Sequence, residues 1–378
     1  MKYRKFGKAD IECSAFGVGC MRFDMTTDED GNKFVDETKS TPIIRRAIEC
    51  GVNYFDTAYV YSGGKNECAL GHALRDGYRD RVYIATKLPT WKVETREDMD
   101  RFLDEQLANL ETDHIDFYLV HSLGLDSWRK IRDLGVCEFL DKAKASGKIK
   151  HACFSFHDNY DAFVEIIDSY DWDMCQIQYN YLDVENQATT RGLDYAYSKN
   201  IPVVIMEGLR GGKLAAPPAN VREILDAYPE KRTPVEWAFR FLLNHPGVCT
   251  ILSGVSTMEQ LEDNLAIFDR NEAGDMTPEE DALIVRAREA FESRTKVGCT
   301  GCEYCVPCPA GVEIPRIFAT WNNLYMFDEK LEGNPRYARL VADNKTTSAC
   351  LECGQCEGVC PQNIPIIEML KKADAEMK

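Results

Sequence analysis

Short β-rich runs alternate with longer helical patterns over most of the chain, and this alternation limits the fold more than any other feature. Short apolar strands separated by amphipathic helices predict a parallel sheet covered by helices. Eight such units within about 270 residues match the size of a (β/α)₈ barrel. The runs lie at residues 15–19, 53–58, 82–87, 115–121, 149–155, 174–180, 202–207 and 248–254.

A doubly wound open sheet is the alternative fold for such an alternation. That fold requires a glycine-rich phosphate loop after the first strand. The first run continues as GVGCMR at residues 17–22, which has two glycines and lacks the third. The sequence therefore predicts an α/β chain built on a (β/α)₈ TIM barrel.

Composition excludes several classes of function. The formal net charge is −17, from 45 basic and 62 acidic side chains. An acidic chain without basic runs is a poor ligand for nucleic acid or anionic membrane surfaces, because such binding depends on cationic side chains. No apolar run approaches a membrane-spanning length, and MKYRKFGKADIEC at the start lacks the apolar core of a signal peptide. The chain is therefore expected to be cytoplasmic, with thiols rather than disulfides.

Four ionisable residues stand at the ends of consecutive predicted strands: Asp56 and Tyr61 after the second, Lys87 after the third and His121 after the fourth. Barrel active sites form at this face. Each residue alone is common in loops, whereas the four together indicate a site. A buried lysine favours the phenolate and is expected to lower the pKa of the tyrosine, while an aspartate keeps the lysine charged. The group predicts a tyrosine acid that works near neutral pH.

Several segments resemble the aldo-keto reductase family in order and spacing: NYFDTAYVY, ATK, YLVH, CQIQYN, EGLRGGKL and GVSTMEQLEDNL. The resemblance covers residues 1 to about 270. It implies a barrel that binds a nicotinamide dinucleotide, NADP or NAD, and transfers hydride reversibly to a carbonyl. It also implies that Tyr61 donates the proton, that Lys87 and Asp56 tune it, and that His121 orients the substrate oxygen.

The same resemblance implies the cofactor contacts. Ser155 and Gln176 correspond to the nicotinamide carboxamide site. Two departures from the family pattern are clear: the segment after the fifth strand reads Ser155-Phe156-His157 where Ser-Asn is frequent, and Gly254 and Gln260 stand where lysine and arginine are common. The choice between NADP and NAD therefore stays open. The remaining predicted contacts are Leu209, Arg210, Gly211 and Lys213 near the pyrophosphate, and Gly254, Gln260 and Asn264 around the adenosine.

Eight of the sixteen cysteines form two runs near the C-terminus. The run at 350–361 has the bacterial ferredoxin spacing C-x₂-C-x₂-C-x₃-C-P, and the run at 299–309 is one residue shorter before its last cysteine. Zinc is the alternative metal for four cysteines per site. The triple C-x₂-C-x₂-C and the trailing Cys-Pro favour two [4Fe–4S] clusters instead. The expected pairing joins Cys299, Cys302, Cys305 and Cys360 on one cluster, and Cys308, Cys350, Cys353 and Cys356 on the other.

The expected organisation is a barrel over 1–275, a connecting helix over 276–296 and a mostly helical ferredoxin-like domain over 297–378. The segment at 25–40 is polar, which favours a surface hairpin over a lid. The expected function is an oxidoreductase acting on an aldehyde, a ketone or the corresponding alcohol with NAD(P)H. Its clusters would exchange electrons with a partner such as a ferredoxin or flavodoxin. Two alternatives remain: the clusters are purely structural, or the chain is a redox sensor without catalysis.

Overall fold

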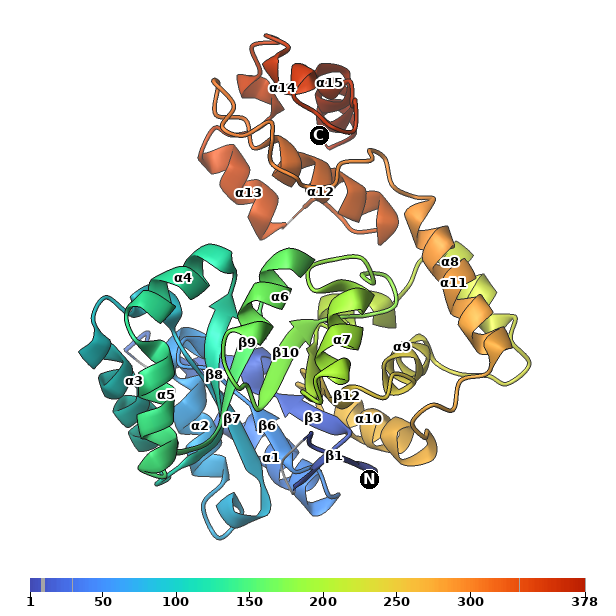
Figure 1. Cartoon of the computed structure of the whole chain (residues 1–378). Coiled ribbons are helices and arrows are strands. Elements are labelled where there is room, and N and C mark those ends of the chain that lie inside the picture. Colours follow the sequence, from blue (N-terminus) through green and yellow to red (C-terminus); the bar gives the residue numbers. More distant parts are fainter. Residues whose placement is uncertain (8–10, 29, 333, 378) are drawn as a thin grey trace. The chain divides into compact units, whose positions relative to one another are not determined.

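The computed structural model describes residues 1–7, 11–28, 30–332 and 334–377. The chain forms two compact units (Figure 1). The first contains Met1–Leu214 and Val235–Pro278, and the second contains Ala215–Pro234 and Glu279–Lys378. No helix of the described residues is both long enough and apolar enough to cross a membrane.

A closed barrel of eight parallel strands forms the centre of the first unit. The strand order is β10-β11-β12-β3-β6-β7-β8-β9, so the first barrel strand, β3, closes the ring beside the last, β12. This confirms the predicted TIM barrel. The strands are β3 Phe16–Gly19, β6 Tyr54–Asp56, β7 Tyr83–Leu88, β8 Ile115–Leu123, β9 Ile149–Phe156, β10 Met174–Gln178, β11 Val203–Met206 and β12 Val248–Ser253.

Amphipathic helices surround the barrel and bury their apolar faces against it (Figure 1). Short 3₁₀ turns follow several strands at the end where the predicted site residues stand. These turns are η1 Cys20–Arg22, η2 Tyr61–Gly64, η4 Thr90–Lys92 and η5 Arg210–Ala215, and η3 Arg79–Arg81 precedes β7. The helices of this unit are α1 Glu37–Glu49, α2 Asn66–Ala73, α3 Arg96–Asn109, α4 Leu125–Asp133, α5 Val136–Ala145, α6 Tyr160–Asp168, α7 Thr189–Ser198, α9 Pro234–Leu243 and α10 Met258–Arg270.

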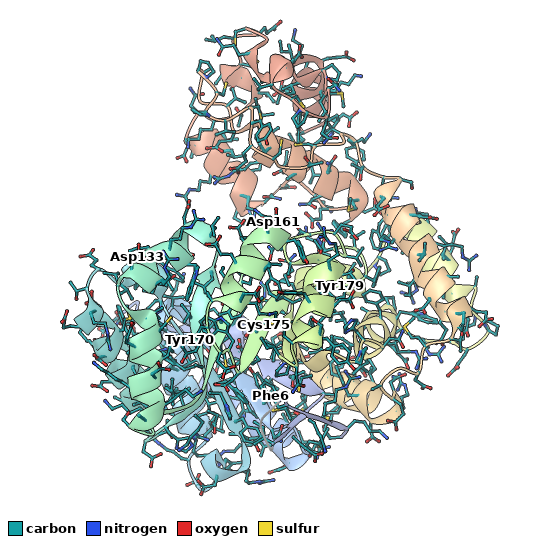
Figure 2. All side chains as sticks on the ribbon, viewed as in Figure 1. Phe6, Asp133, Asp161, Tyr170, Cys175 and Tyr179 are labelled. Carbon is teal, nitrogen blue, oxygen red and sulfur yellow. The ribbon has the colours of Figure 1, made fainter. Side chains whose placement is uncertain are left out.

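The N-terminal hairpin of β1 Tyr3–Lys5 and β2 Glu12–Ser14 belongs to the floor of the barrel. Phe6, which follows β1, is labelled in Figure 2. It packs on Phe117 with ring centroids 4.5 Å apart and on Tyr54 at 6.5 Å. These rings fill the interior at the start of the strands. The opposite end, where the strands finish, is therefore the end that carries the polar side chains.

The polar insertion after the first barrel strand forms a second hairpin. β4 Met25–Thr27 pairs antiparallel with β5 Lys33–Val35, and most of its side chains are exposed. The surface hairpin expected for this segment is therefore present. The insertion ends earlier than expected, because α1 already begins at Glu37.

The second unit is helical and has its own apolar core. Ile317, Phe318 and Trp321 on one helix pack with Leu370 and Ala373 on another. Arg294, just after α11, donates to the Tyr325 carbonyl at 2.7 Å and to Asn220 at 3.2 Å, which joins three helices of this unit. Its elements are α8 Ala219–Asp226, α11 Pro278–Glu292, α12 Ile314–Met326, α13 Pro335–Ala342, η6 Thr347–Ala349, α14 Gln355–Gly358 and α15 Ile366–Glu376.

Candidate functional site

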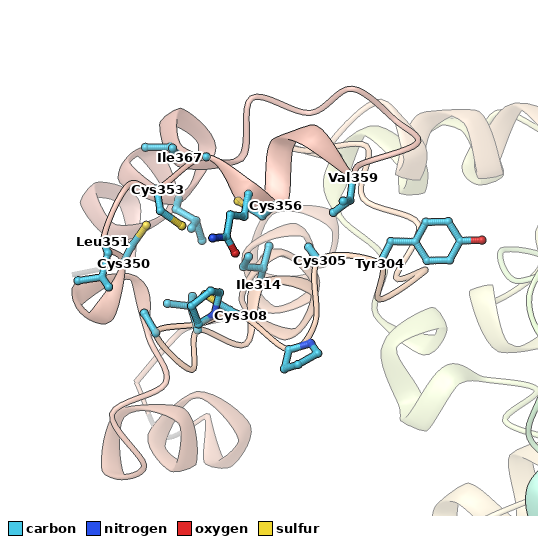
Figure 3. A pocket seen from close by; sticks show the side chains of 17 residues that line it. Tyr304, Cys305, Cys308, Ile314, Cys350, Leu351, Cys353, Cys356, Val359 and Ile367 are labelled. Atoms are coloured by element: carbon cyan, nitrogen blue, oxygen red, sulfur yellow. The ribbon is translucent and has the colours of Figure 1, made fainter.

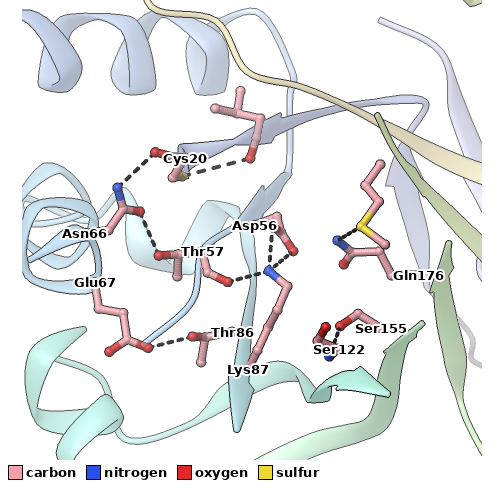
Figure 4. Close-up of polar contacts among 12 residues, drawn as sticks. Cys20, Asp56, Thr57, Asn66, Glu67, Thr86, Lys87, Ser122, Ser155 and Gln176 are labelled. Atoms are coloured by element: carbon pink, nitrogen blue, oxygen red, sulfur yellow. Dashed lines mark hydrogen bonds and ion pairs between the residues drawn. The ribbon is translucent and has the colours of Figure 1, made fainter. Parts of the chain in front are cut away.

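Lys87 and Asp56 form a buried ion pair between neighbouring barrel strands. The Lys87 ammonium donates to Asp56 Oδ1 at 2.7 Å, to Oδ2 at 2.8 Å and to the Thr57 carbonyl at 2.6 Å (Figure 4). The two residues are 1% and 3% exposed. Burial alone lowers the pKa of Lys87, but Asp56 and Tyr61 more than offset it and leave that pKa raised. The lysine is therefore a permanent positive charge inside the barrel.

A second buried hydrogen-bond network contacts the backbone of Lys87. Gln106 on α3 donates to the Lys87 carbonyl at 3.1 Å and to Glu67 at 2.7 Å. Glu67 also accepts from Thr86 at 2.6 Å, next to Lys87 in the chain (Figure 4). Buried polar groups that are fully bonded in this way fix a single conformation. The network therefore fixes the backbone from which Lys87 projects.

Tyr61 lies against the charged end of Lys87. The Lys87 nitrogen is 4.9 Å from the centre of the Tyr61 ring. Burial raises the pKa of Tyr61, and the charge of Lys87 with a hydrogen bond from it offsets only part of that rise. The expectation that Lys87 brings this pKa below its ordinary value was therefore wrong for the protein alone, since desolvation of the phenolate outweighs the lysine. The phenol is protonated at neutral pH.

His121 completes the group at the end of β8. Its ring centre is 6.2 Å from that of Tyr61 and 5.0 Å from that of Trp91. Burial, then the charges of Lys87 and His157, lower the pKa of His121 to about 2. Nδ1 is buried without a hydrogen-bond partner in the described structure. His121 is consequently a neutral imidazole, which carries one N–H to donate and one nitrogen to accept.

Ser155 and Gln176 lie side by side, because β9 and β10 pair with these residues in register. The Ser155 hydroxyl accepts from the Ser122 amide at 2.8 Å, and the Gln176 amide nitrogen donates weakly to Met206 sulfur at 3.7 Å (Figure 4). Gln176 Oε1 is buried and has no partner among the described residues. A buried acceptor without a donor is costly, and a primary carboxamide would supply that donor. The pair therefore fits the nicotinamide group predicted for it.

The predicted pyrophosphate loop has a left-handed backbone. Arg210, Gly211 and Gly212 have φ values of 49°, 65° and 94°. Arg210 reaches Asp183 at 3.4 Å. Such a succession of positive φ values brings backbone groups close to a ligand, and glycine makes it inexpensive at two of the three positions.

Two of the predicted adenosine contacts, Gln260 and Asn264, make hydrogen bonds to residues close to them in the chain. Gln260 accepts from the Ser256 amide at 2.9 Å, and Asn264 donates to the Ser253 hydroxyl at 2.9 Å. These bonds shape the turn between β12 and α10. Gly254 lies in that turn, next to the side chain of Arg22.

Arg22 and Trp91 are site residues that the sequence analysis missed. Arg22 ends η1 directly after the first barrel strand, and Trp91, which is 53% exposed, packs beside His121 with its ring tilted by 50°. Both follow a barrel strand, so the rule that located Lys87 and His121 also applied to them. His157, which stands near the position where the family often has asparagine, lies near enough to His121 to affect its pKa.

The cysteines of the second unit line two cavities. One is lined by Cys299, Cys302, Cys305 and Cys360, the four thiols expected on one cluster. The other, of about 150 Å³, is lined by Cys308, Cys350, Cys353 and Cys356, with Cys305 between the two (Figure 3). Among the described side chains, no three His, Cys, Asp or Glu are gathered closely enough to hold a single metal ion.

Residues with left-handed backbone conformation flank an exposed cysteine at each cavity. Gly301 has φ 71° and Glu303 63°, on either side of Cys302, and Glu352 has 53° and Gly354 75°, on either side of Cys353. These turns let successive thiols of a C-x₂-C repeat face one point. The donor set fits two four-thiolate clusters, and the cavity lined by Cys299 is the narrower of the two, at about 20 Å³. The assignment of each ligand stays a prediction.

Comparison with known proteins gives two matches along the chain. Residues 15–278 match the sequence model of the aldo/keto reductase family, and residues 298–364 match that of the 4Fe-4S dicluster domain.

Individual relatives match most of the chain's length. The uncharacterized oxidoreductase YqkF of Bacillus subtilis is 24% identical over 70% of this chain and 90% of its own, and the L-galactose dehydrogenase of Arabidopsis thaliana is 24% identical over 70% and 88%. Among solved structures, the holo form of aldo-keto reductase AKR11C1 from Bacillus halodurans has a TM-score of 0.64 at 25% identity, covering 76% of this chain and 96% of its own. An aldo-keto reductase from Klebsiella pneumoniae in complex with NADPH has a TM-score of 0.60 at 23% identity, covering 75% and 94%.

Proposed function

Because the chain belongs to the aldo/keto reductase family, we propose that it reduces an aldehyde or ketone, or oxidises the corresponding alcohol, with a nicotinamide dinucleotide. The observation that carries this proposal is the buried Lys87–Asp56 pair against Tyr61, beside a neutral His121. Burying two charges costs desolvation energy, so a buried ion pair is weak evidence for a purely stabilising role. Here it places one positive charge where a phenolate forms.

The residues divide the proton chemistry among them. The dinucleotide, when bound, supplies the hydride that reaches the carbonyl carbon. Tyr61 donates its phenolic proton to the carbonyl oxygen, and Lys87 stabilises the phenolate that remains. Asp56 keeps Lys87 charged, and the neutral His121 donates a hydrogen bond that orients the same oxygen. One carbonyl, one reduced nicotinamide and one proton from solvent give one alcohol and one oxidised nicotinamide.

The cofactor is NADP or NAD, held by Ser155 and Gln176 at its carboxamide. Gln176 Oε1 supports this role, because it is a buried acceptor that lacks a donor within the described structure. The loop of Leu209, Arg210, Gly211 and Lys213 would receive the pyrophosphate, with the turn of Gly254, Gln260 and Asn264 at the adenosine. The NADPH found with the Klebsiella relative supports a dinucleotide of this class.

The second unit carries two [4Fe–4S] clusters in this proposal, each exchanging one electron at a time with a partner such as a ferredoxin or flavodoxin. Each cavity has one exposed thiol, Cys302 in one and Cys353 in the other. An exposed ligand places the edge of a cluster at the surface, where a partner can reach it. The other six thiols pack against the apolar core of the unit, which favours an additional structural role for the clusters.

Isotope transfer tests the hydride reaction directly. The protein is incubated with a panel of sugars, keto acids and small aldehydes and with NADH or NADPH that carries deuterium at C4 of its reduced nicotinamide. The proposal expects deuterium on the carbinol carbon of at least one alcohol product. Transfer to none of the panel, by a protein that binds the dinucleotide, would remove the support for carbonyl reduction.

Electron paramagnetic resonance tests the clusters separately. Reduction by dithionite is expected to give the signals of two paramagnetic [4Fe–4S] clusters, and a partner protein is expected to reoxidise them. Clusters that cannot be reduced at any accessible potential would leave only the structural role.

A further inference from the structure

The side chain of Arg22 occupies the space that a side chain at residue 254 would fill. A Cβ on Gly254 would lie 2.7 Å from Arg22 Cγ and 3.2 Å from Arg22 Cβ. Carbon atoms do not approach to 2.7 Å without displacement. The absence of a side chain at Gly254 is therefore what allows Arg22 to cross this turn.

The far end of Arg22 reaches a second loop. Its Nη2 atom is 3.4 Å from the position of a Cβ on Gly211, a residue held in the left-handed region at φ 65°. Arg22 thus extends from the turn after β12 to the loop after β11. Both loops adjoin it because β3, which precedes Arg22, closes the barrel beside β12.

The guanidinium has no counter-ion in the described structure, which gives Arg22 neither a hydrogen bond nor an ion pair, and its side chain is exposed. Glu207 Oε2 lies 3.7 Å from the same Gly211 Cβ position, and among the described residues no ion pair joins it to Arg22. A guanidinium binds phosphate through two parallel hydrogen bonds, and a guanidinium without an ion pair has these donors available.

We propose that Arg22 binds the pyrophosphate of the dinucleotide, supplying from the first barrel strand the cation that residue 254 lacks. This inference rests on the proposed function. The tip of Arg22 lies beside Gly211 rather than beyond the turn at Gly254, which places its charge at the phosphates that NAD and NADP share. The contact therefore adds affinity for both dinucleotides equally.

Direct binding measures the role of Arg22. Titration of Arg22→Ala with NADH and NADPH, followed by protein fluorescence, is expected to show affinity about tenfold to a hundredfold weaker for both, the range for a charged hydrogen bond. Arg129→Ala is the control, because Arg129 is a half-exposed arginine on α4 paired with Glu165. Circular dichroism melting confirms that each variant is folded.

A double-mutant cycle tests the geometry. Gly254→Ala is expected to weaken binding by displacing Arg22, and to add no further loss when Arg22 is already alanine. Gly254→Lys combined with Arg22→Ala is expected to regain most of the affinity, because the lysine enters the vacated space.

The outcomes separate this inference from the proposed function. A wild-type protein that binds neither dinucleotide overturns both. Wild-type binding that Arg22→Ala leaves unchanged overturns the role of Arg22 alone. A loss confined to NADPH also overturns it, because the charge would then serve the 2′-phosphate and not the pyrophosphate.

Discussion

Lys87 donates hydrogen bonds to both carboxylate oxygens of Asp56, at 2.7 and 2.8 Å, and both residues are buried. The pair joins the adjacent strands β6 and β7, and the Lys87 nitrogen lies against the ring of Tyr61. Its geometry fixes the charge that the proposed proton transfer needs.

Replacement of Asp56 by asparagine is expected to impair both stability and catalysis. Removing one partner of a buried ion pair typically costs about 3–5 kcal/mol of unfolding free energy. Burial then lowers the pKa of Lys87, and a neutral lysine no longer stabilises a phenolate. Urea unfolding and the turnover number measure the two effects.

Glu165→Gln is the matched control, because Glu165 pairs with Arg129 at the surface and such pairs contribute about 1 kcal/mol or less. Equal stability losses in the two variants would contradict the importance assigned to the buried pair.

The pH dependence of the two reaction directions is expected to be opposite. Because the pKa of Tyr61 is raised, the phenol stays protonated from neutral pH to beyond its ordinary value of about 10. The rate of carbonyl reduction, which needs the proton, should not change with pH over this range and should fall only in more alkaline buffer. The rate of alcohol oxidation, which needs the phenolate, should rise as the rate of reduction falls. Lys87→Met removes the group that lowers this pKa and should move both profiles to higher pH. A reduction rate that already falls near neutrality would contradict the assignment.

His121 is expected to make the protein less stable in acid. Its pKa is about 2 in the folded chain and about 6.5 when exposed. The unfolded state therefore binds more protons below about pH 6.5, and stability decreases as the pH falls through that range, by at most about 1.4 kcal/mol per pH unit. His121→Gln should reduce this slope between about pH 6.5 and about pH 5. Equal slopes in denaturant unfolding would show that the imidazole is not held neutral.

Iron content distinguishes crossed from sequential cysteine pairing. Two clusters give about eight irons per chain. Cys302→Ala combined with Cys360→Ala should lose one cluster only, since both thiols line the same cavity, whereas Cys302→Ala with Cys308→Ala should lose both. Sequential pairing would reverse these two results. Cys137→Ala, outside both runs, is the control.

The barrel strands were predictable because parallel strands buried on both faces are continuous apolar runs. Each of the eight runs overlaps its observed strand, and every end agrees to within two residues. The segment at 25–40 was expected to be a surface hairpin, but its last residues belong to helix α1, which begins at Glu37. In the structure the Asp36 side chain caps the helix by accepting from the Thr38 amide, and Pro42 falls within it.

The site was only partly predictable, because some of its contacts depend on barrel closure. Asp56, Lys87 and His121 follow consecutive strands, so their proximity follows from the predicted fold. Arg22 meets Gly254 only because β3 and β12 become neighbours, and nothing local to residue 22 indicates this. The raised pKa of Tyr61 likewise depends on burial that a sequence does not quantify.

Replacement of Tyr61 by phenylalanine tests the central claim most directly. The turnover number for carbonyl reduction is expected to fall about 10²–10⁴-fold, the usual contribution of general acid catalysis, with dinucleotide affinity unchanged. Tyr197→Phe, at a tyrosine that is 52% exposed on α7, should retain full activity. A Tyr61→Phe protein that reduces the carbonyl as fast as the wild type would contradict the account.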